Sequence, residues 1–280
     1  MQQSGVLYVV ATPIGNRADL SPRAVEVLRA ADIIAAEDTR HSRPLLAHFG
    51  IHGPLVALHE HNEQRVAAGL LARLLAGESV ALISDAGTPL LSDPGYQLVR
   101  SAREQGIRVS PVPGPSALLA ALSVAGLPTD RFVFEGFLPS KPAARRARLT
   151  GLKDEPRTLV FYESAHRIVD CVRDMAAVLG AGREAVLARE LTKLYEQVHS
   201  AALGDLAAWL EVEPNRQKGE FVVLVRGAEA LASDRLTAAD ERLLGLLLAE
   251  LPAARAAALA ARITGKPKRL FYARAVGNGE

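Results

Sequence analysis

The first half of the chain repeats one order, a short apolar strand followed by a helix, and this order constrains the fold most. Apolar or β-branched runs suited to buried strands lie at residues 6–11, 33–36, 55–58, 79–83 and 107–112. Between them, Leu70, Leu71 and Leu74 show helical spacing, and Ser21-Pro22 predicts a helix start because serine caps and proline suits the first turn. Strands that alternate with helices predict an α/β fold with a mostly parallel sheet.

The rest of the chain predicts a second α/β domain and a helical tail. Gly126-Leu127-Pro128 is typical of a boundary, and five further strand-like runs follow at 132–136, 158–162, 185–188, 196–200 and 220–225. Some of these strands are close enough in sequence to pair antiparallel. Three short helices follow a capping-box pattern at Thr237. We therefore predict two α/β domains, 1–126 and 127–230, and a small helical domain, 231–280.

Composition excludes several classes of protein. The chain has 280 residues, 33 Lys and Arg against 31 Asp and Glu, 49% hydrophobic residues and a net charge of +2, as in ordinary globular proteins. Such a chain buries roughly three quarters of its unfolded surface and needs no disulfide or metal for stability. The sequence has a single cysteine, Cys171, and shows neither a signal peptide nor an apolar run of about 18 residues. These features predict a cytoplasmic protein without a membrane anchor. The near-neutral charge argues against binding a polyanion with the whole surface.

Four loops after predicted strands predict a ligand pocket. They are rich in Gly, Pro, Ser, Thr and Asp and lie at residues 11–16, 37–41, 84–95 and 111–117. Ligands of α/β sheets bind beyond the carboxyl ends of the strands, where these loops meet. Glycine lets a ligand approach the main chain, and proline restricts the loop in advance. Any one loop by itself is explained equally well as a simple turn.

Several familiar sites are missing. The sequence has no P-loop and no G-x-S-x-G elbow, and Gly180-Ala-Gly182 follows a predicted helix, so it predicts a turn and not a dinucleotide site. The spacing of His59 and His61 matches no standard zinc site, and we expect no metal. Cys171 lies within an apolar helical stretch, where core packing is the simplest interpretation.

A cluster of basic residues indicates a nucleic-acid partner or, alternatively, a solvated helix face. Cations lined along a cleft suit a phosphate backbone. The predicted RNA-binding residues are Arg40, Arg43, Lys141, Arg145, Arg146, Arg148 and Arg167.

The loops and strand ends together resemble one enzyme family. The segments are 11–16 (ATPIGN), 37–40 (EDTR), 84–89 (SDAGTP), 112–117 (VPGPSA), 161–164 (FYES), 166–168 (HRI) and 188–193 (ARELTK). In this order they resemble the tetrapyrrole methylase superfamily, in its 16S rRNA (cytidine-2′-O)-methyltransferase branch. The resemblance covers about residues 7–226, and the tail is similar to the small helix-turn-helix-like domain of that branch.

The resemblance implies a two-domain α/β enzyme, usually a homodimer, with S-adenosyl-L-methionine bound in the cleft between the domains. It implies methylation of the ribose 2′-OH of a cytidine in the decoding region of 16S rRNA, in the small ribosomal subunit. The cofactor contacts that it implies are Thr12, Pro13, Gly87, Thr88, Pro89, Leu91, Ser116, Ala117, Tyr162, Leu191 and Gly219.

Methyl transfer to a hydroxyl needs an oriented oxygen and a group that takes its proton. Asp38, Glu190 and Lys193 are the candidates for this role, although an ion pair with only a structural role explains Asp38 better. Two alternatives stay open: a methyltransferase of a small tetrapyrrole-like molecule, and a non-catalytic RNA-binding assembly factor. The basic cluster and the helical tail favour RNA.

Overall fold

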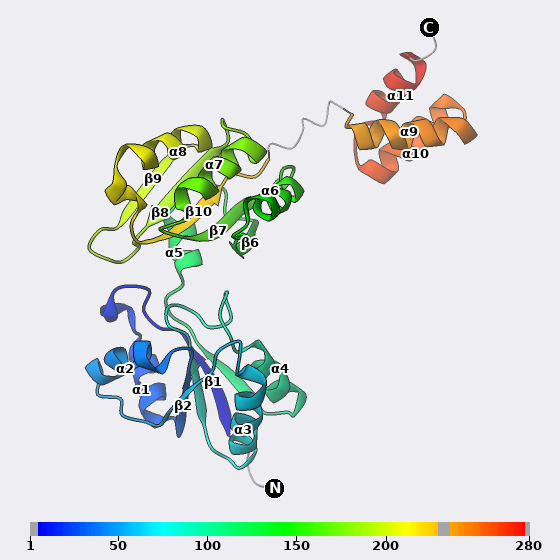
Figure 1. Ribbon diagram of the computed structural model, residues 1–280. Helices are drawn as coiled ribbons and strands as arrows, with labels where there is room; N and C mark the ends of the chain where they lie inside the picture. The colour runs from blue at the N-terminus through cyan, green and yellow to red at the C-terminus, as the bar shows by residue number, and fades with distance from the viewer. Residues whose placement is uncertain (1–4, 229–235, 278–280) are drawn as a thin grey trace. The chain divides into compact units, whose positions relative to one another are not determined.

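The computed structural model describes residues 5–228 and 236–277 and divides into two compact units (Figure 1). The first unit contains residues 1–153 and 157–226, and the second contains residues 154–156 and 227–280. The first unit holds two sheets of five strands each. The second unit holds the helices of the tail.

The first sheet is parallel throughout, as the sequence predicts. Its strands are β1 (Val6–Val10), β2 (Ile33–Ala36), β3 (Leu55–Ala57), β4 (Val80–Ile83) and β5 (Arg108–Val112), in the order β3-β2-β4-β1-β5. Every residue of β2 and β4 is buried, because helices cover both faces of the sheet.

Two pairs of helices cover the two faces of this sheet. Helices α3 (Glu63–Leu75) and α4 (Tyr96–Glu104) pack on one face, while α1 (Pro22–Ala30) and α2 (Thr39–His48) pack on the other (Figure 1). The Ser21 hydroxyl accepts a hydrogen bond from Ala24 N, which confirms the predicted cap of α1. A single turn of 3₁₀ helix, η1 (Arg17–Asp19), precedes α1.

Helix α2 was not predicted, because Pro44 lies inside it. Proline removes a backbone donor and is unfavourable in a helix interior. Asp38 stabilises the start of the helix by accepting a hydrogen bond from Arg40 N at 2.8 Å, and Leu46 anchors it in the core.

The second sheet is mixed, again as predicted. Its strand order is β6-β7-β10-β8-β9, and the strands are β6 (Phe132–Phe137), β7 (Thr158–Ser164), β8 (Glu184–Arg189), β9 (Gln197–Ala202) and β10 (Glu220–Val225). The pair β6 and β7 is parallel, and the other three neighbouring pairs are antiparallel. Helices α6 (Pro142–Gly151), α7 (Ile168–Leu179) and α8 (Leu203–Val212) cover one face, and a short 3₁₀ helix, η2 (Pro214–Gln217), precedes β10. Helix α7 begins at Ile168, later than predicted, because residues 165–167 form a turn.

Helix α5 (Ala117–Val124) connects the two sheets. Its residues Leu118, Ala121 and Leu122 pack against Val160 and Val222 of the second sheet. The predicted division at 126/127 follows this helix, yet the contacts of α5 help to join both sheets in one unit. The predicted boundary at 230/231 lies outside the described residues, and the division into three domains stays a prediction.

The tail forms its own small core. Helices α9 (Ala238–Glu250), α10 (Ala253–Thr264) and α11 (Lys268–Gly277) enclose Leu244, Ala256 and Phe271. Thr237 and Asp240 form the predicted capping box, and Lys266 pairs with Asp240. Within residues 5–228 and 236–277, no helix is long and apolar enough to cross a membrane.

Candidate active site

The four loops at the carboxyl edge of the first sheet are hydrogen-bonded to one another. Thr12 and Gly87 exchange two backbone hydrogen bonds, of 2.9 and 3.0 Å, which join the loops after β1 and β4. Thr88 Oγ1 donates to Pro115 O at 3.0 Å, and Asp38 N donates to Asp85 Oδ1 at 3.0 Å. All four loops therefore form one connected rim, as the parallel order of the strands predicts.

A cavity of about 390 Å³ lies between this rim and the second sheet. Its volume falls within the range of small-molecule sites, roughly 300–1,000 Å³. The second sheet contributes mainly apolar and aromatic side chains, among them Phe137, Tyr162, Ala188, Leu191 and Val222. We call it the cofactor cavity, because most of the predicted cofactor contacts line it.

The predicted contacts divide into two groups. Those that line the cofactor cavity are Gly87, Thr88, Leu91, Ser116, Ala117, Tyr162 and Leu191. The other four, Thr12, Pro13, Pro89 and Gly219, do not line it. Thr12 is buried beneath the rim, where its hydroxyl donates to Ser84 O at 3.2 Å, and Pro13 lines a neighbouring cavity.

Gly219 makes room for Glu190. Its φ is +99°, and a Cβ at this position would lie 2.5 Å from Cγ and Cδ of Glu190. A larger residue would therefore displace Glu190. This close approach explains the glycine without a cofactor contact.

Strained backbone is concentrated in two loops beside the cavity. Within the described residues, the non-glycine residues with positive φ are Leu90, Ser92, Glu190 and Thr192. The first two lie in the loop after β4, and the other two follow β8 on the opposite side of the cavity. Such conformations are unfavourable and persist where the surrounding structure holds them, typically at functional sites.

Carboxylates from the rim form an acidic wall of the cofactor cavity, made of Glu37, Asp85 and Asp93. Glu37 Oε2 accepts a hydrogen bond from Asp85 N at 3.4 Å. Burial raises the pKa of Glu37, and burial together with the charge of Glu37 raises the pKa of Asp93 to about 6. None of these three carboxylates is among the predicted site residues, although Glu37 directly follows a buried strand. An acidic wall of this kind suits a cationic ligand.

All three predicted catalytic residues are held in ion pairs, and only Lys193 lines the cofactor cavity. Asp38 pairs with Arg40 at 2.8 Å, and hydrogen bonds from Arg40 lower the pKa of Asp38 to about 2. Lys193 Nζ donates to Glu190 Oε1 at 2.8 Å and to Glu220 Oε2 at 2.9 Å. Burial disfavours the charged forms of Glu190 and Lys193. The hydrogen bonds between these groups and with Glu220 have a larger effect than burial, so the pKa of Glu190 is lowered and the pKa of Lys193 is raised. Asp38 and Glu190 are thus ionised and weakly basic, while Lys193 stays a cation at the border of the cavity.

Comparison with known proteins identifies the family. The chain matches the family profile "Tetrapyrrole (Corrin/Porphyrin) Methylases" over residues 6–207 and the profile "RsmI C-terminal HTH domain" over residues 234–278. It is 57% identical to the ribosomal RNA small subunit methyltransferase I of Xylella fastidiosa (strain Temecula1), over 97% of this chain and 99% of the relative. The protein of the same name from Escherichia coli O157:H7 is also 57% identical, over 96% of this chain and 93% of the relative.

The chain belongs to the tetrapyrrole methylase family, within its ribosomal RNA small subunit methyltransferase I group. Solved structures agree with this fold. Diphthine synthase aligns with a TM-score of 0.60 at 18% identity, over 83% of this chain and 92% of that chain. Uroporphyrin-III C-methyltransferase from Thermus thermophilus, complexed with S-adenyl homocysteine, aligns with a TM-score of 0.53 at 22% identity, over 80% and 98% of the two chains. The predicted fold class and the resemblance are confirmed.

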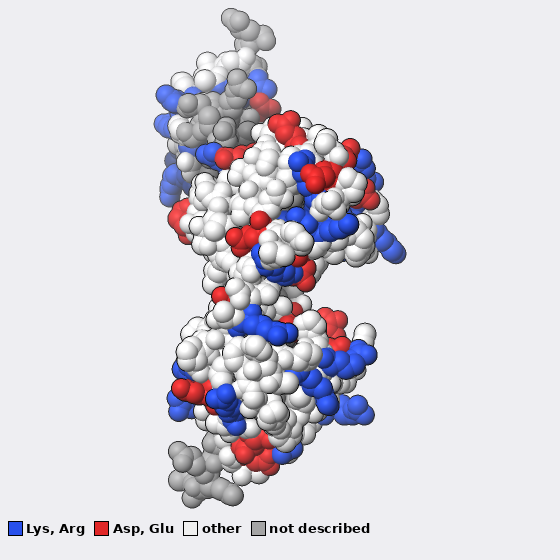
Figure 2. Space-filling view, turned by 90° about the vertical axis from the view of Figure 1, so that its left-hand side faces the viewer, with Lys and Arg blue, Asp and Glu red and all other residues white. Residues whose placement is uncertain are grey.

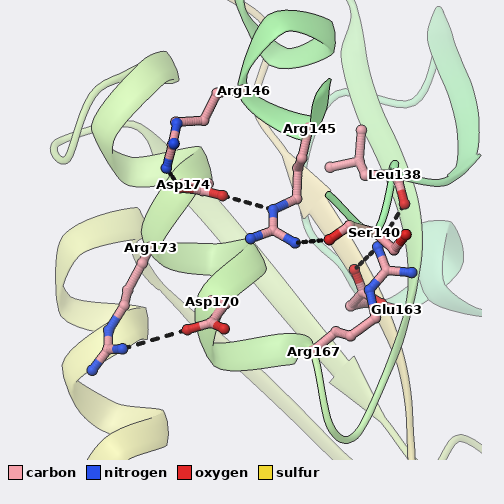
Figure 3. A network of polar contacts seen from close by, with 9 residues as sticks. All are labelled: Leu138, Ser140, Arg145, Arg146, Glu163, Arg167, Asp170, Arg173 and Asp174. Atoms are coloured by element: carbon pink, nitrogen blue, oxygen red, sulfur yellow. Dashed lines mark hydrogen bonds and ion pairs between the residues drawn. The ribbon is translucent and has the colours of Figure 1, made fainter. Parts of the chain in front are cut away.

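In this tetrapyrrole methylase, the predicted basic cluster is largely a network of ion pairs (Figure 3). Arg145 is only 4% exposed, and its Nε donates to Asp174 Oδ2 at 2.7 Å, which holds α6 against α7. Arg146 bonds the same carboxylate at 3.1 Å, and Arg148 pairs with Glu135. Arg145 is therefore not accessible to RNA, and Arg146 and Arg148 are exposed but already paired.

The other predicted RNA-binding residues differ in their availability. Arg167 is half-buried, pairs with Glu163 and donates to Leu138 O (Figure 3). Lys141 and Arg43 are exposed and form no ion pair with any described residue. Figure 2 shows Lys and Arg side chains interspersed with Asp and Glu on the face drawn. RNA binding thus stays a proposal for Arg40, Arg43 and Lys141, and the structure gives Arg145 a structural role.

The raised pKa of Asp93 predicts a pH-dependent stability. Because the folded-state pKa of about 6 lies above the ordinary value of 3.8, wild-type stability falls as the pH rises through this window. Asp93→Asn removes this penalty. We expect the variant to exceed the wild type by about 1 kcal/mol above pH 7, after allowance for solvent screening, with no gain near pH 4. Urea unfolding between pH 4 and 8 measures this difference.

The matched control is Asp19→Asn, an exposed carboxylate in η1 that forms no ion pair with any described residue. It should show no gain that depends on pH. An equal gain from Asp93→Asn at pH 4 and at pH 8 would contradict the prediction.

The ion-pair network predicts different effects for two neighbouring cations. Arg145→Ala leaves the Asp174 carboxylate buried with only Arg146 as its partner, and we expect a loss of about 3 kcal/mol in the free energy of unfolding. Lys141→Ala should change stability by less than about 0.5 kcal/mol and should instead weaken RNA binding. Urea unfolding and filter binding to RNA distinguish them. Wild-type stability in Arg145→Ala would show that the pair with Asp174 is unimportant.

Proposed function

We propose that this chain transfers the methyl group of S-adenosylmethionine to 16S rRNA, at the ribose 2′-OH of cytidine 1402 in the bacterial numbering. Near full-length relatives at 57% identity carry the name ribosomal RNA small subunit methyltransferase I, which supports an rRNA substrate. The observation that carries the proposal in the structure is the cofactor cavity with its acidic wall. A ribosomal substrate supports a cytoplasmic location.

The residues of the cofactor cavity fit S-adenosylmethionine. This cofactor carries a sulfonium and an ammonium group, and the carboxylates of Glu37, Asp85 and Asp93 complement this charge. Ser116 is 6% exposed, and its hydroxyl has no hydrogen-bond partner among the described residues. A buried hydroxyl without a partner is unfavourable unless a ligand or water completes it.

Apolar side chains of Leu91, Leu191 and Val222, with the ring of Tyr162, line the remainder of the cavity and suit the purine. Tyr162 Oη accepts a hydrogen bond from Leu118 N at 3.1 Å, which holds the ring in place. When bound, the cofactor supplies an electrophilic methyl group.

The chain's own residues orient the acceptor and take its proton. A ribose hydroxyl attacks well only as its proton leaves, and a base with a pKa near the working pH serves best. Asp93 meets this condition better than Asp38 or Glu190, because its pKa is about 6 and it lines the cofactor cavity. We therefore assign proton transfer to Asp93. Lys193 lies at the border of the cavity, where its charge stabilises the developing oxyanion, and Glu190 positions Lys193.

A homodimer is the proposed assembly. Leu194 and Tyr195, in the loop after β8, are 88% and 68% exposed, and large exposed apolar side chains favour burial against a partner. Sedimentation equilibrium of the wild type and of a Leu194→Ser/Tyr195→Ser variant measures the assembly. The variant should be monomeric.

Methyl transfer from labelled S-adenosylmethionine to small ribosomal subunits that lack the modification tests the reaction. We expect label in 2′-O-methylcytidine after nuclease digestion and mass spectrometry. Asp93→Asn should lower kcat at least tenfold, since positioned bases typically contribute about 10²–10⁴-fold. Label on a base, or on a small molecule and not on RNA, would overturn the proposal. Calorimetry that detects no binding of S-adenosylmethionine would instead favour a non-catalytic RNA-binding factor.

A further inference from the structure

A second cavity adjoins the cofactor cavity and has a different chemistry. It encloses about 480 Å³ between residues 13–17, the first turns of α2 and the start of the loop after β4. We call it the side cavity. Both cavities share one wall, made of Ile14, Asp85, Ala86, Lys193 and Glu220. A ligand in the side cavity would therefore lie next to a ligand in the cofactor cavity.

Cations border the side cavity. Arg17 is exposed, and its guanidinium makes no hydrogen bond or ion pair with any other described residue. The Arg40 side chain is 89% exposed and donates from Nε and Nη2 to Asp38, while its Nη1 makes no hydrogen bond with any described residue. Lys193 is held by Glu190 and Glu220. Arg17 and Arg40 are thus the cations with donors still available to an anion.

A buried hydroxyl in the side cavity also lacks a partner. Ser42 lies on α2, is 3% exposed and lines the cavity. Its Oγ has no hydrogen-bond partner among the described residues. Leaving a buried hydroxyl unpaired is unfavourable, so this atom indicates a place where a ligand completes the hydrogen bonding.

Two carboxylates, Asp85 and Glu220, line the same cavity. They would repel an isolated anion, so the side cavity is a poor site for free phosphate. They are, however, good acceptors for ribose hydroxyls and for the amino group of cytosine. Cations and carboxylates in one cavity together match a nucleotide, which carries both a phosphate and hydrogen-bond donors.

We propose that the side cavity binds the acceptor nucleotide of the RNA, with a flanking phosphate against Arg17 and Arg40 and the ribose at the shared wall. This inference rests on the proposed function and specifies the substrate subsite of the same reaction. One nucleotide carries both a phosphate and a 2′-OH, and the cations and the shared wall line the same cavity. We expect the nucleotide to enter this cavity unstacked from its neighbours, as enzymes that act on a single nucleotide require.

Steady-state kinetics with unmodified small ribosomal subunits test this inference. Arg17→Ala should raise KM for the subunits about tenfold and reduce the salt dependence of binding by about one charge, while the affinity for S-adenosylmethionine is unchanged. The matched control is Arg103→Ala on α4, an exposed arginine outside both cavities with no ion pair to a described residue. It should change KM less than twofold.

Ser42→Ala provides a second, independent variant. It removes the unpaired hydroxyl, so the melting temperature should stay equal or rise, whereas KM for the subunits should rise about threefold. A merely structural serine would instead lower the melting temperature and leave KM unchanged.

The outcomes separate the two proposals. If the wild type methylates the subunits but Arg17→Ala and Ser42→Ala match the Arg103→Ala control, the side cavity does not bind the nucleotide. If the wild type transfers no methyl group to RNA, the proposed function itself is overturned.

Discussion

The paired backbone hydrogen bonds between Thr12 and Gly87 are the contact on which the site depends. They join the loops after β1 and β4, two neighbouring strands of a parallel sheet, and the Thr12 side chain adds a bond to Ser84 O. Since parallel strands end at the same edge, the bonds from Thr88 to Pro115 and from Asp38 to Asp85 can then add the other two loops to the rim. The left-handed residues Leu90 and Ser92 follow directly in the loop after β4, so the strain there is supported by a well-anchored neighbour.

The second sheet completes the site through its antiparallel register. Residue Phe221 of β10 lies opposite Arg189 of β8, which brings Glu220 next to the loop that carries Glu190 and Lys193. The close approach at Gly219 and the bond from Glu220 N to Glu190 Oε1 then hold Lys193 between two carboxylates. The cation at the shared wall thus depends on Gly219 and Glu190, two residues that line neither cavity. Helix α5 maintains this arrangement, because its apolar face packs on the second sheet while its first residue lines the cofactor cavity.

The sequence predicts the strands and the rim loops, because periodicity and turn residues are local signals. The resemblance to a family adds seven of the residues that line the cofactor cavity. The sequence does not reveal α2, because Pro44 is a local signal against a helix. Tertiary packing overrides that signal. The sequence misplaces Arg145, whose partner Asp174 lies 29 residues away on another helix. It also overlooks Glu37 and Asp93, because their raised pKa values arise from burial and from neighbouring carboxylates, which for both include Asp85. Neither cause is visible in the chain order. Local rules therefore recover the frame of the site, while its electrostatics require the packed structure.

A net charge of +2 does not measure how this chain attracts RNA, because pairing decides which charges act. Arg145, Arg146 and Arg148 appear as a strong basic run, yet carboxylates of α7 and β6 already neutralise them. Arg17, in contrast, stands alone in the sequence and keeps all of its donors. An exposed ion pair contributes little to stability, whereas an unpaired cation beside a cavity retains its full interaction with a phosphate. Charge accordingly acts here through its unpaired remainder, and Arg17 brings part of that remainder to the side cavity.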